Sequence, residues 1–258
     1  MTRTHTVAFS ELTRVLPWSL RALGYPLGTA DRGSHVIATA AALDPTTLDD
    51  VAQLGHRPAE GFRLTREAAG GLVIEADGVS LLEIGPVVMD HFAAYAEDAG
   101  TLHCRIVGAD DIGLLPAILL IGADYGLGSL ALVRKDGEMA WSGAEPEDGS
   151  VVLHGASGQG APDRPRSQNP TIETWLRKAN PAPGEILLLV TSGNLGLDRS
   201  GSIETVDARV VLQAHAKGIP VSANTLQAFY DLETRTWMPS SERSRGQAGF
   251  TVPKEQAK

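Results

Sequence analysis

Two adjacent carboxylates, Asp110 and Asp111, directly follow a predicted strand. The strand is expected because Leu102, Cys104 and Ile106 alternate with polar residues, which is the period of a half-buried strand. A pair of carboxylates can carry out acid–base chemistry when burial shifts the pKa of one of them. Aspartate is also a preferred helix N-cap, so the pair could equally begin the helix that follows. We expect Asp111 to be a general acid or base, with Asp110 beside it.

A second candidate is the Gly-rich segment Ser192-Gly193-Asn194-Leu195-Gly196, which follows a strongly apolar run at residues 185–191. Ligands of open α/β sheets bind beyond the carboxyl ends of the strands. A glycine-rich turn there exposes backbone N–H groups that can hold an anion. We expect Ser192 to take part in catalysis and Gly193 and Asn194 to bind substrate. The alternative is a turn that only connects two elements.

A third candidate lies near the C-terminus, where Ser241, Glu242, Arg243 and Arg245 fall within a hydroxyl-rich stretch. Arginine can bind a carboxylate through two parallel hydrogen bonds. We expect Arg243 or Arg245 to hold a substrate carboxylate, with Glu242 orienting the guanidinium and Ser241 contributing to binding. The alternative is a solvated C-terminal segment.

Other chemical signals are weaker. The loop 155–160 is rich in glycine but carries no phosphate-loop lysine, and neither Ser157 nor Ser192 lies in a Gly-x-Ser-x-Gly turn. The chain has one cysteine, so an internal disulfide and a cysteine-based zinc site are excluded. No histidine pair has the spacing of a metal site, and we predict no metal.

The composition is that of an ordinary soluble globular protein: 258 residues, 43% apolar and 21% charged. A net charge of −9 argues against nucleic acid or an anionic membrane surface as a partner. No apolar run approaches the roughly 20 residues that span a bilayer, and the N-terminus lacks the pattern of a signal peptide. We therefore expect a cytoplasmic protein with a small-molecule ligand.

Periodicity divides the chain into three parts. Residues 1–56 carry three helical patterns and predict a small helical N-terminal module. Residues 57–245 predict an α/β domain, and residues 246–258 a flexible tail. Small residues on one face of the helix at 29–43 indicate close approach to a neighbouring element, either within the core or at a dimer seam.

The centre of the α/β domain is residues 71–133, where strand and helix patterns alternate as strand, helix, strand, helix, strand. Such alternation is typical of a parallel sheet with right-handed crossovers. The apolar run at 185–191 predicts another buried strand of this sheet. The expected fold class is therefore α/β, with a central, mostly parallel sheet and crossover helices.

Two segments at opposite ends of the chain resemble an uncharacterised family of bacterial cytoplasmic proteins. The stretch 236–245 contains an aromatic residue, a proline and a Ser-Glu-x-Ser-Arg motif, followed by a short Gly/Ala-containing tail. The stretch 21–30 resembles the opening of the same family. This resemblance spans the chain and implies no particular activity.

The order of elements in residues 71–133 resembles the malate/L-lactate dehydrogenase-like oxidoreductases, a non-Rossmann family. Gly24-Tyr25-Pro26 resembles that family's N-terminal turn, and Asp31-Arg32-Gly33-Ser34-His35 partly matches its Asp-Leu-Arg-Gly-x-x-Ser-His-Gly motif. Asp111-Ile112-Gly113 stands where the family has His-x-Gly. The resemblance implies a dehydrogenase-like core, a homodimer and NAD(P) as cofactor. Because Asp111 stands in place of the family's histidine, the resemblance does not extend to hydride transfer.

These observations predict a small-metabolite enzyme or binder that acts on a small polar acid or amide. One alternative is a non-catalytic accessory or regulatory subunit of a partner enzyme. Another is an amidohydrolase that uses Ser157 or Ser192 as nucleophile. If the protein is an enzyme, Asp111, Ser192 and Arg245 are expected to line one pocket.

Overall fold

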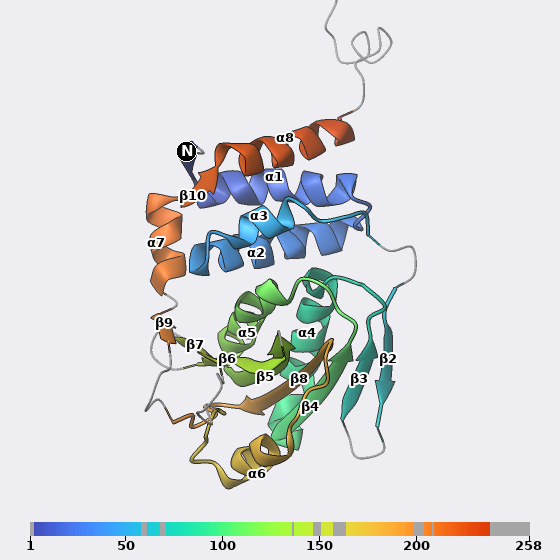
Figure 1. Ribbon diagram of the computed structural model, residues 1–258, viewed down its shortest axis with the longest axis vertical. Helices are drawn as coiled ribbons and strands as arrows, with labels where there is room; N and C mark the ends of the chain where they lie inside the picture. The colour runs from blue at the N-terminus through green and yellow to red at the C-terminus, as the bar shows by residue number, and fades with distance from the viewer. Residues whose placement is uncertain are drawn as a thin grey trace, which may run out of the picture.

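The computed structural model describes residues 3–57, 61–67, 71–135, 137–146, 151–156, 164–198, 204–207 and 209–237, and the statements below concern these residues. A layer of helices lies on one side of the molecule and a large sheet on the other, with two helices between them (Figure 1). The described helices include none that is both long and apolar enough to cross a membrane.

The helical layer combines the two ends of the chain. Its strands β1 (Thr4–Val7) and β10 (Ile219–Ser222) pair antiparallel. Its helices are α1 (Phe9–Ala22), α2 (Leu27–Leu43), α3 (Thr47–Val51), α7 (Arg209–Lys217) and α8 (Ala223–Thr236). Helix α8 lies along α1 (Figure 1), and the hydroxyl of Ser19 donates to the carbonyl of Phe229 at 2.9 Å. Arg14 of α1 binds the buried carboxylate of Glu233 of α8 at 2.8 Å. Polar contacts therefore fix α8 on the N-terminal helices.

The large sheet has the strand order β2-β3-β4-β8-β5-β6-β7-β9. The strands are β2 (Arg63–Arg66), β3 (Leu72–Glu75), β4 (Thr101–Val107), β5 (Leu127–Lys135), β6 (Glu138–Glu145), β7 (Val151–Ala156), β8 (Glu185–Ser192) and β9 (Glu204–Asp207). Helix α4 (Leu81–Ala99) connects β3 to β4. A short 3-10 turn, η1 (Ile112–Leu114), and helix α5 (Leu115–Asp124) connect β4 to β5.

The prediction of a mostly parallel sheet is wrong. Among the described strands only β3 and β4 pair in parallel; the other neighbours are antiparallel. The β3-α4-β4-α5-β5 unit itself runs in one direction, as expected, because β8 is antiparallel to both β4 and β5. Strand β8 lies between β4 and β5, and local alternation cannot reveal that a strand from later in the chain inserts there.

Both faces of the central strands are buried. The side chains of Ile186, Leu188 and Val190 join the core shared with α4, α5 and the helical layer. Leu189 of the same strand joins a second core under α6 (Pro170–Lys178), on the opposite face. This two-sided burial explains the continuous apolar run at residues 185–191 and confirms it as a buried strand.

The sequence analysis predicts none of three strands, β6, β9 and β10. Residues 135–149 are rich in polar and turn-forming residues, yet they contain β6. Its buried Met139 and Trp141 do alternate with partly exposed residues, but serine and glycine lower the strand propensity of the segment. Strand β10 contains Pro220, which is compatible with its place in a two-stranded edge pair.

Helix α2 packs through the small-residue face that the sequence predicted. A Cβ atom added at Gly33 would lie 2.4 Å from Cδ1 of Leu82 in α4 and 3.4 Å from Cδ1 of Leu20 in α1. We expect Gly33→Val to destabilise the fold by about 2 kcal/mol through overpacking. A Cβ atom added at Gly28, on the same helix, would have no neighbouring atom within 4 Å. Gly28→Ala is therefore expected to leave the stability unchanged or to raise it slightly. Chemical denaturation of both variants tests this; equal stabilities would contradict the tight α2–α4 contact.

Candidate functional site

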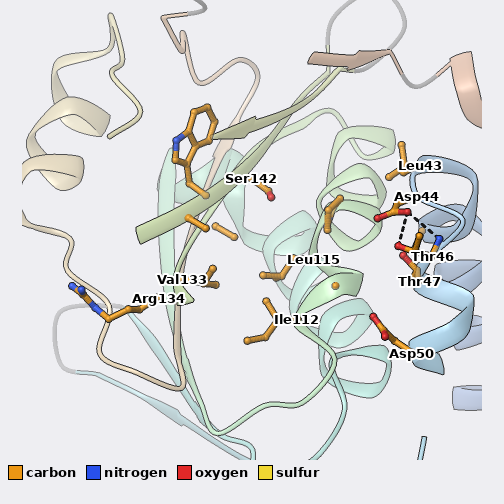
Figure 2. A pocket seen from close by; sticks show the side chains of 16 residues that line it. Leu43, Asp44, Thr46, Thr47, Asp50, Ile112, Leu115, Val133, Arg134 and Ser142 are labelled. Carbon is orange, nitrogen blue, oxygen red and sulfur yellow. Dashed lines mark hydrogen bonds between the residues drawn. The ribbon is translucent and has the colours of Figure 1, made fainter. Parts of the chain in front are cut away.

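A cavity of about 480 Å³ lies between the helical layer and the sheet. Three structures form its walls: the end of α2 with α3, the turn η1 with the start of α5, and strands β5 and β6 (Figure 2). This volume is within the range of small-molecule sites. The cavity is therefore the candidate site.

The floor of the cavity is the surface of β5 and β6. The register pairs Val133 with Ala140 and Ala131 with Ser142, and these small side chains share the cavity face. The pair between them, Leu132 and Trp141, belongs to the opposite face and is buried in the core under α6. Small residues at the cavity-facing positions leave the space open.

Arg134 contributes to the lining, but its guanidinium does not enter the cavity. It pairs with Met139 and so belongs to the α6 face. Its nitrogens donate to the carbonyls of Pro181 and Gly137 at 3.1 and 2.8 Å and to Oδ1 of Asn180 at 2.9 Å. Figure 2 shows the guanidinium directed away from the other labelled side chains. No positive charge from Arg134 faces the cavity.

The helical wall of the cavity carries two carboxylates. Asp44 follows the last residue of α2, and its Oδ1 accepts hydrogen bonds from the amide and hydroxyl of Thr46 at 2.9 and 2.7 Å (Figure 2). Asp50 lies on α3 and has no ion pair among the described residues. Helix α2 ends at Leu43 with no basic residue in its last turn, so the negative end of its dipole also lies at this wall.

Asp111 lies directly before the cavity residues Ile112 and Gly113. Its backbone is left-handed, with φ 63°, a conformation that aspartate and asparagine adopt more readily than most residues. Its Oδ2 atom is buried and has no hydrogen-bond partner. The expected alternative, that Asp111 caps the following helix, is wrong, because its side chain makes no capping hydrogen bond.

The surroundings of Asp111 favour a protonated carboxyl. Burial raises the pKa of Asp111, and the charges of Asp110 and Asp50 raise it further, while a contact with the Ser80 side chain acts in the opposite direction. Asp110 is itself exposed. The two adjacent carboxylates thus occupy different environments, as acid–base chemistry requires.

Two further residues belong to this cluster. Ser80 is the buried N-cap of α4, and its hydroxyl accepts from the amide of Leu82 at 3.1 Å. Tyr25 lies between α1 and α2 and is 5% exposed. Burial, together with the negative charge of Asp111, raises the pKa of Tyr25 to about 12. Tyr25 therefore keeps its proton at neutral pH and can only act as a neutral hydroxyl.

Ser192 is not near Asp111. Strands β4 and β8 are antiparallel, with Thr101 opposite Thr191 and Val107 opposite Glu185. Ser192 therefore lies at the end of β4 where that strand begins, and Asp111 follows the end where it finishes. Six residue steps along a strand separate the two ends by about 20 Å. The expected convergence of Ser192 and Asp111 on one pocket is not observed.

The backbone of the Ser192–Gly196 segment is largely engaged within the fold. The amides of Ser192 and Gly193 donate to the carbonyls of Gly100 and Gly126 at 3.2 and 3.1 Å. The carbonyl of Leu195 accepts from the hydroxyl of Ser167 at 2.6 Å. These bonds favour the alternative that the segment connects and packs elements, and they leave the expected anion cradle without two of its amide donors.

The remaining predicted site residues, Ser241, Glu242, Arg243 and Arg245, lie outside the described residues, as do Ser157 and the predicted tail. Cys104 is buried, and burial raises the pKa of its thiol to about 12, so it is an inert core residue. Within the described ranges, no cluster of histidine, cysteine and acidic residues could hold a metal ion.

With the site described, the chain can be compared with known proteins. No protein-family model matches the sequence, and no curated protein matches it. Solved structures do match. The fold resembles that of malate/L-lactate dehydrogenase-like proteins.

Three structures illustrate the likeness. Malate dehydrogenase from Entamoeba histolytica aligns with a TM-score of 0.64 at 10% identity, covering 92% of this chain and 99% of that one. Malate dehydrogenase from Pyrococcus horikoshii OT3 aligns with a TM-score of 0.63 at 12% identity, covering 93% of this chain and 99% of that one. Sulfolactate dehydrogenase from Methanocaldococcus jannaschii aligns with a TM-score of 0.59 at 10% identity, covering 90% of this chain and 97% of that one. Identities this low establish a common fold and no common activity.

The cavity is poorly suited to a nicotinamide dinucleotide. The pyrophosphate of such a cofactor is anionic, and proteins hold such groups with helix N-termini and basic side chains. The described lining offers instead the carboxylates of Asp44 and Asp50 and the C-terminus of α2, while Arg134 is turned away. The residues that line the cavity therefore do not fit this cofactor.

Sequence analysis found Asp110 and Asp111 but missed the other residues of the site. Asp44 and Asp50 were not among the candidate site residues. Tyr25 and Ser80 had no chemical motif at all. The left-handed conformation of Asp111 likewise has no clear signal in the sequence.

Proposed function

We propose that the protein binds a small metabolite in the cavity between α2–α3 and β5–β6, with Asp111 as the acid–base group of the site. The observation that carries this proposal is the unpaired, buried Oδ2 atom of Asp111, which directly precedes the residues Ile112 and Gly113 that line a cavity of ligand size. A buried carboxyl oxygen without a hydrogen-bond partner costs free energy, and such groups concentrate at functional sites. Asp111 would hold or release a proton, and Tyr25 and Ser80 would support it as neutral hydroxyls.

The dehydrogenase-like fold supports a role in small-molecule chemistry. The relatives named above are dehydrogenases, and this chain shares their architecture along most of its length. We do not extend hydride transfer to this chain, because the cavity lining does not fit the dinucleotide. Chemistry at the cavity is then confined to what Asp111 and its neighbours supply, which is proton transfer.

A second candidate function is that of a non-catalytic accessory subunit that keeps the fold and binds a partner enzyme. The separation of Ser192 from Asp111 by the length of a strand supports this alternative. It predicts that the cavity has no ligand of its own.

A thermal-shift screen of three proteins distinguishes the candidates. The panel contains small amines, hydroxy acids, amides and nicotinamide cofactors. Ala140→Leu fills the cavity floor, and Ala94→Leu places the same change on the exposed face of α4. We expect a ligand at 100 times its Kd to stabilise the wild type and Ala94→Leu by about 2.7 kcal/mol, and Ala140→Leu much less.

Two outcomes would contradict the proposal, and a third would overturn the exclusion of the dinucleotide. Equal stabilisation of all three proteins would place the ligand outside the cavity. No stabilisation by any compound would favour the accessory subunit. Stabilisation by a nicotinamide cofactor that Ala140→Leu abolishes would show that the cavity accepts the dinucleotide after all.

A further inference from the structure

The charges around the cavity allow its ligand to be specified further. The described side chains that carry charge on its helical wall are Asp44 and Asp50, both negative. Asp111 directly precedes the η1 turn and is not itself one of the residues that line the cavity. The cation among the lining residues, Arg134, directs its guanidinium to carbonyl and amide oxygens on the other face of the sheet.

The backbone adds to this negative potential. Helix α2 has 17 residues, and Ala40 and Leu43 of its last turn line the cavity. A basic residue in the last turn can offset the partial negative charge of a helix C-terminus, and α2 has none. The helix C-terminus and the carboxylates each make the electrostatic potential of the cavity more negative.

The rest of the lining is apolar. Ile112, Leu115 and Val133 point toward one another in Figure 2, opposite the carboxylates. A ligand that matches both walls has an apolar body on the sheet side and a positive group on the helix side. Such an arrangement also excludes anions, because a carboxylate in this cavity would face like charges without a compensating cation.

We propose that the cavity selects an organic cation, a primary amine or a related ammonium ion with a compact apolar body, with the cationic group placed between Asp44 and Asp50. This inference rests on the proposed function and names the chemical class of its ligand. It separates this chain from the fold relatives, two of which are named for malate and one for sulfolactate, all of them anions.

Three probes of nearly equal shape and different charge test the inference: benzylammonium, benzyl alcohol and benzoate. Binding is followed by the amide NMR signals of Ile112, Gly113 and Val133, which report on the cavity itself. We expect benzylammonium to bind at least about tenfold more tightly than benzyl alcohol, and benzoate more weakly than either. Added salt is expected to weaken the binding of benzylammonium and to leave the binding of benzyl alcohol unchanged.

Substitutions that remove single charges locate the selectivity. Asp50→Asn is expected to weaken the binding of benzylammonium about three- to fivefold without changing the binding of benzyl alcohol. The double variant Asp44→Asn/Asp50→Asn is expected to reduce the preference for the cation to about twofold or less. Asp31→Asn is the matched control, because it removes the same charge from an exposed position in the first half of α2.

The outcomes separate this inference from the proposed function. Tighter binding of benzoate or benzyl alcohol, with shifts at the cavity signals, would overturn the charge selectivity and leave the small-molecule site in place. Absence of shifts at these signals with every probe would contradict the inference. If Asp31→Asn reduced the preference for benzylammonium as much as Asp50→Asn does, the preference would come from the overall charge of the protein. That result would also overturn the inference.

Discussion

Asp111→Asn is expected to make the protein more stable at neutral pH while removing its acid–base group. The Oδ2 atom of Asp111 is buried without a partner, and burial raises the pKa of this carboxyl. An unsatisfied buried polar atom costs about 1–3 kcal/mol, and more when it is charged. Asparagine has nearly the same shape and tolerates the left-handed backbone, so the substitution removes the charge with little strain.

The pH dependence gives this prediction its sign. A carboxyl whose pKa is raised by folding stabilises the folded state in its protonated form. That contribution is fully present below the unfolded pKa of about 3.9 and is lost as the pH rises through the folded pKa. The advantage of Asp111→Asn over the wild type should therefore be absent near pH 3.5 and reach its full value above the folded pKa of Asp111.

Asp77→Asn is the matched control for this experiment. Asp77 also has a positive φ, 49°, but its side chain is exposed. The same substitution there is expected to change the stability by less than about 0.5 kcal/mol. Urea denaturation of the three proteins across this pH range decides the matter. A stability loss in Asp111→Asn at pH 7 would show that the carboxylate is well satisfied and would remove the basis for its assigned role.

Gly128→Ala is expected to cost about 3 kcal/mol of stability through overpacking. Gly128 lies on β5, where an added Cβ would be 2.4 Å from the carbonyl oxygen of Gly193 and 3.0 Å from the amide nitrogen of Leu195. Both are backbone atoms, so no change of rotamer can relieve the contact. The segment that follows β8 would have to move away from β5.

Gly143→Ala on β6 is a suitable comparison. Its added Cβ would meet Cδ1 of Leu197 at 3.1 Å, the end of a flexible side chain that can turn aside. We expect the cost there to be below about 1.5 kcal/mol, measured by chemical denaturation in the same way. Similar stabilities of the two variants would mean that the Gly193–Leu195 segment is free to move, and would restore it as a candidate ligand loop.

Much of the fold could be predicted from local sequence. The alternation around Cys104, the apolar run of β8 and the small-residue face of α2 each follow from one element's own pattern. Strand pairing does not. β8 begins 50 residues after the end of β5 and pairs with it along one edge, and no local period encodes that choice.

The site shows the same limit. Asp111 could be found because two carboxylates follow a strand, and that pattern is local. The role of Asp44 and Asp50 depends on the end of α2 facing β5 and β6 across the cavity. The direction of Arg134 depends on the register of β5 with β6, which places it opposite Met139 on the α6 face. Charge selectivity therefore arises from tertiary contacts that the sequence pattern does not show.

The most direct test of the central claim is a carbon-13 NMR titration of the Asp111 carboxyl, with its signal assigned by loss in Asp111→Asn. The account predicts a pKa above the ordinary aspartate value of about 3.9, which falls when benzylammonium fills the cavity, because a nearby cation favours the ionised carboxylate. A pKa at or below the ordinary value that does not respond to benzylammonium would contradict the account.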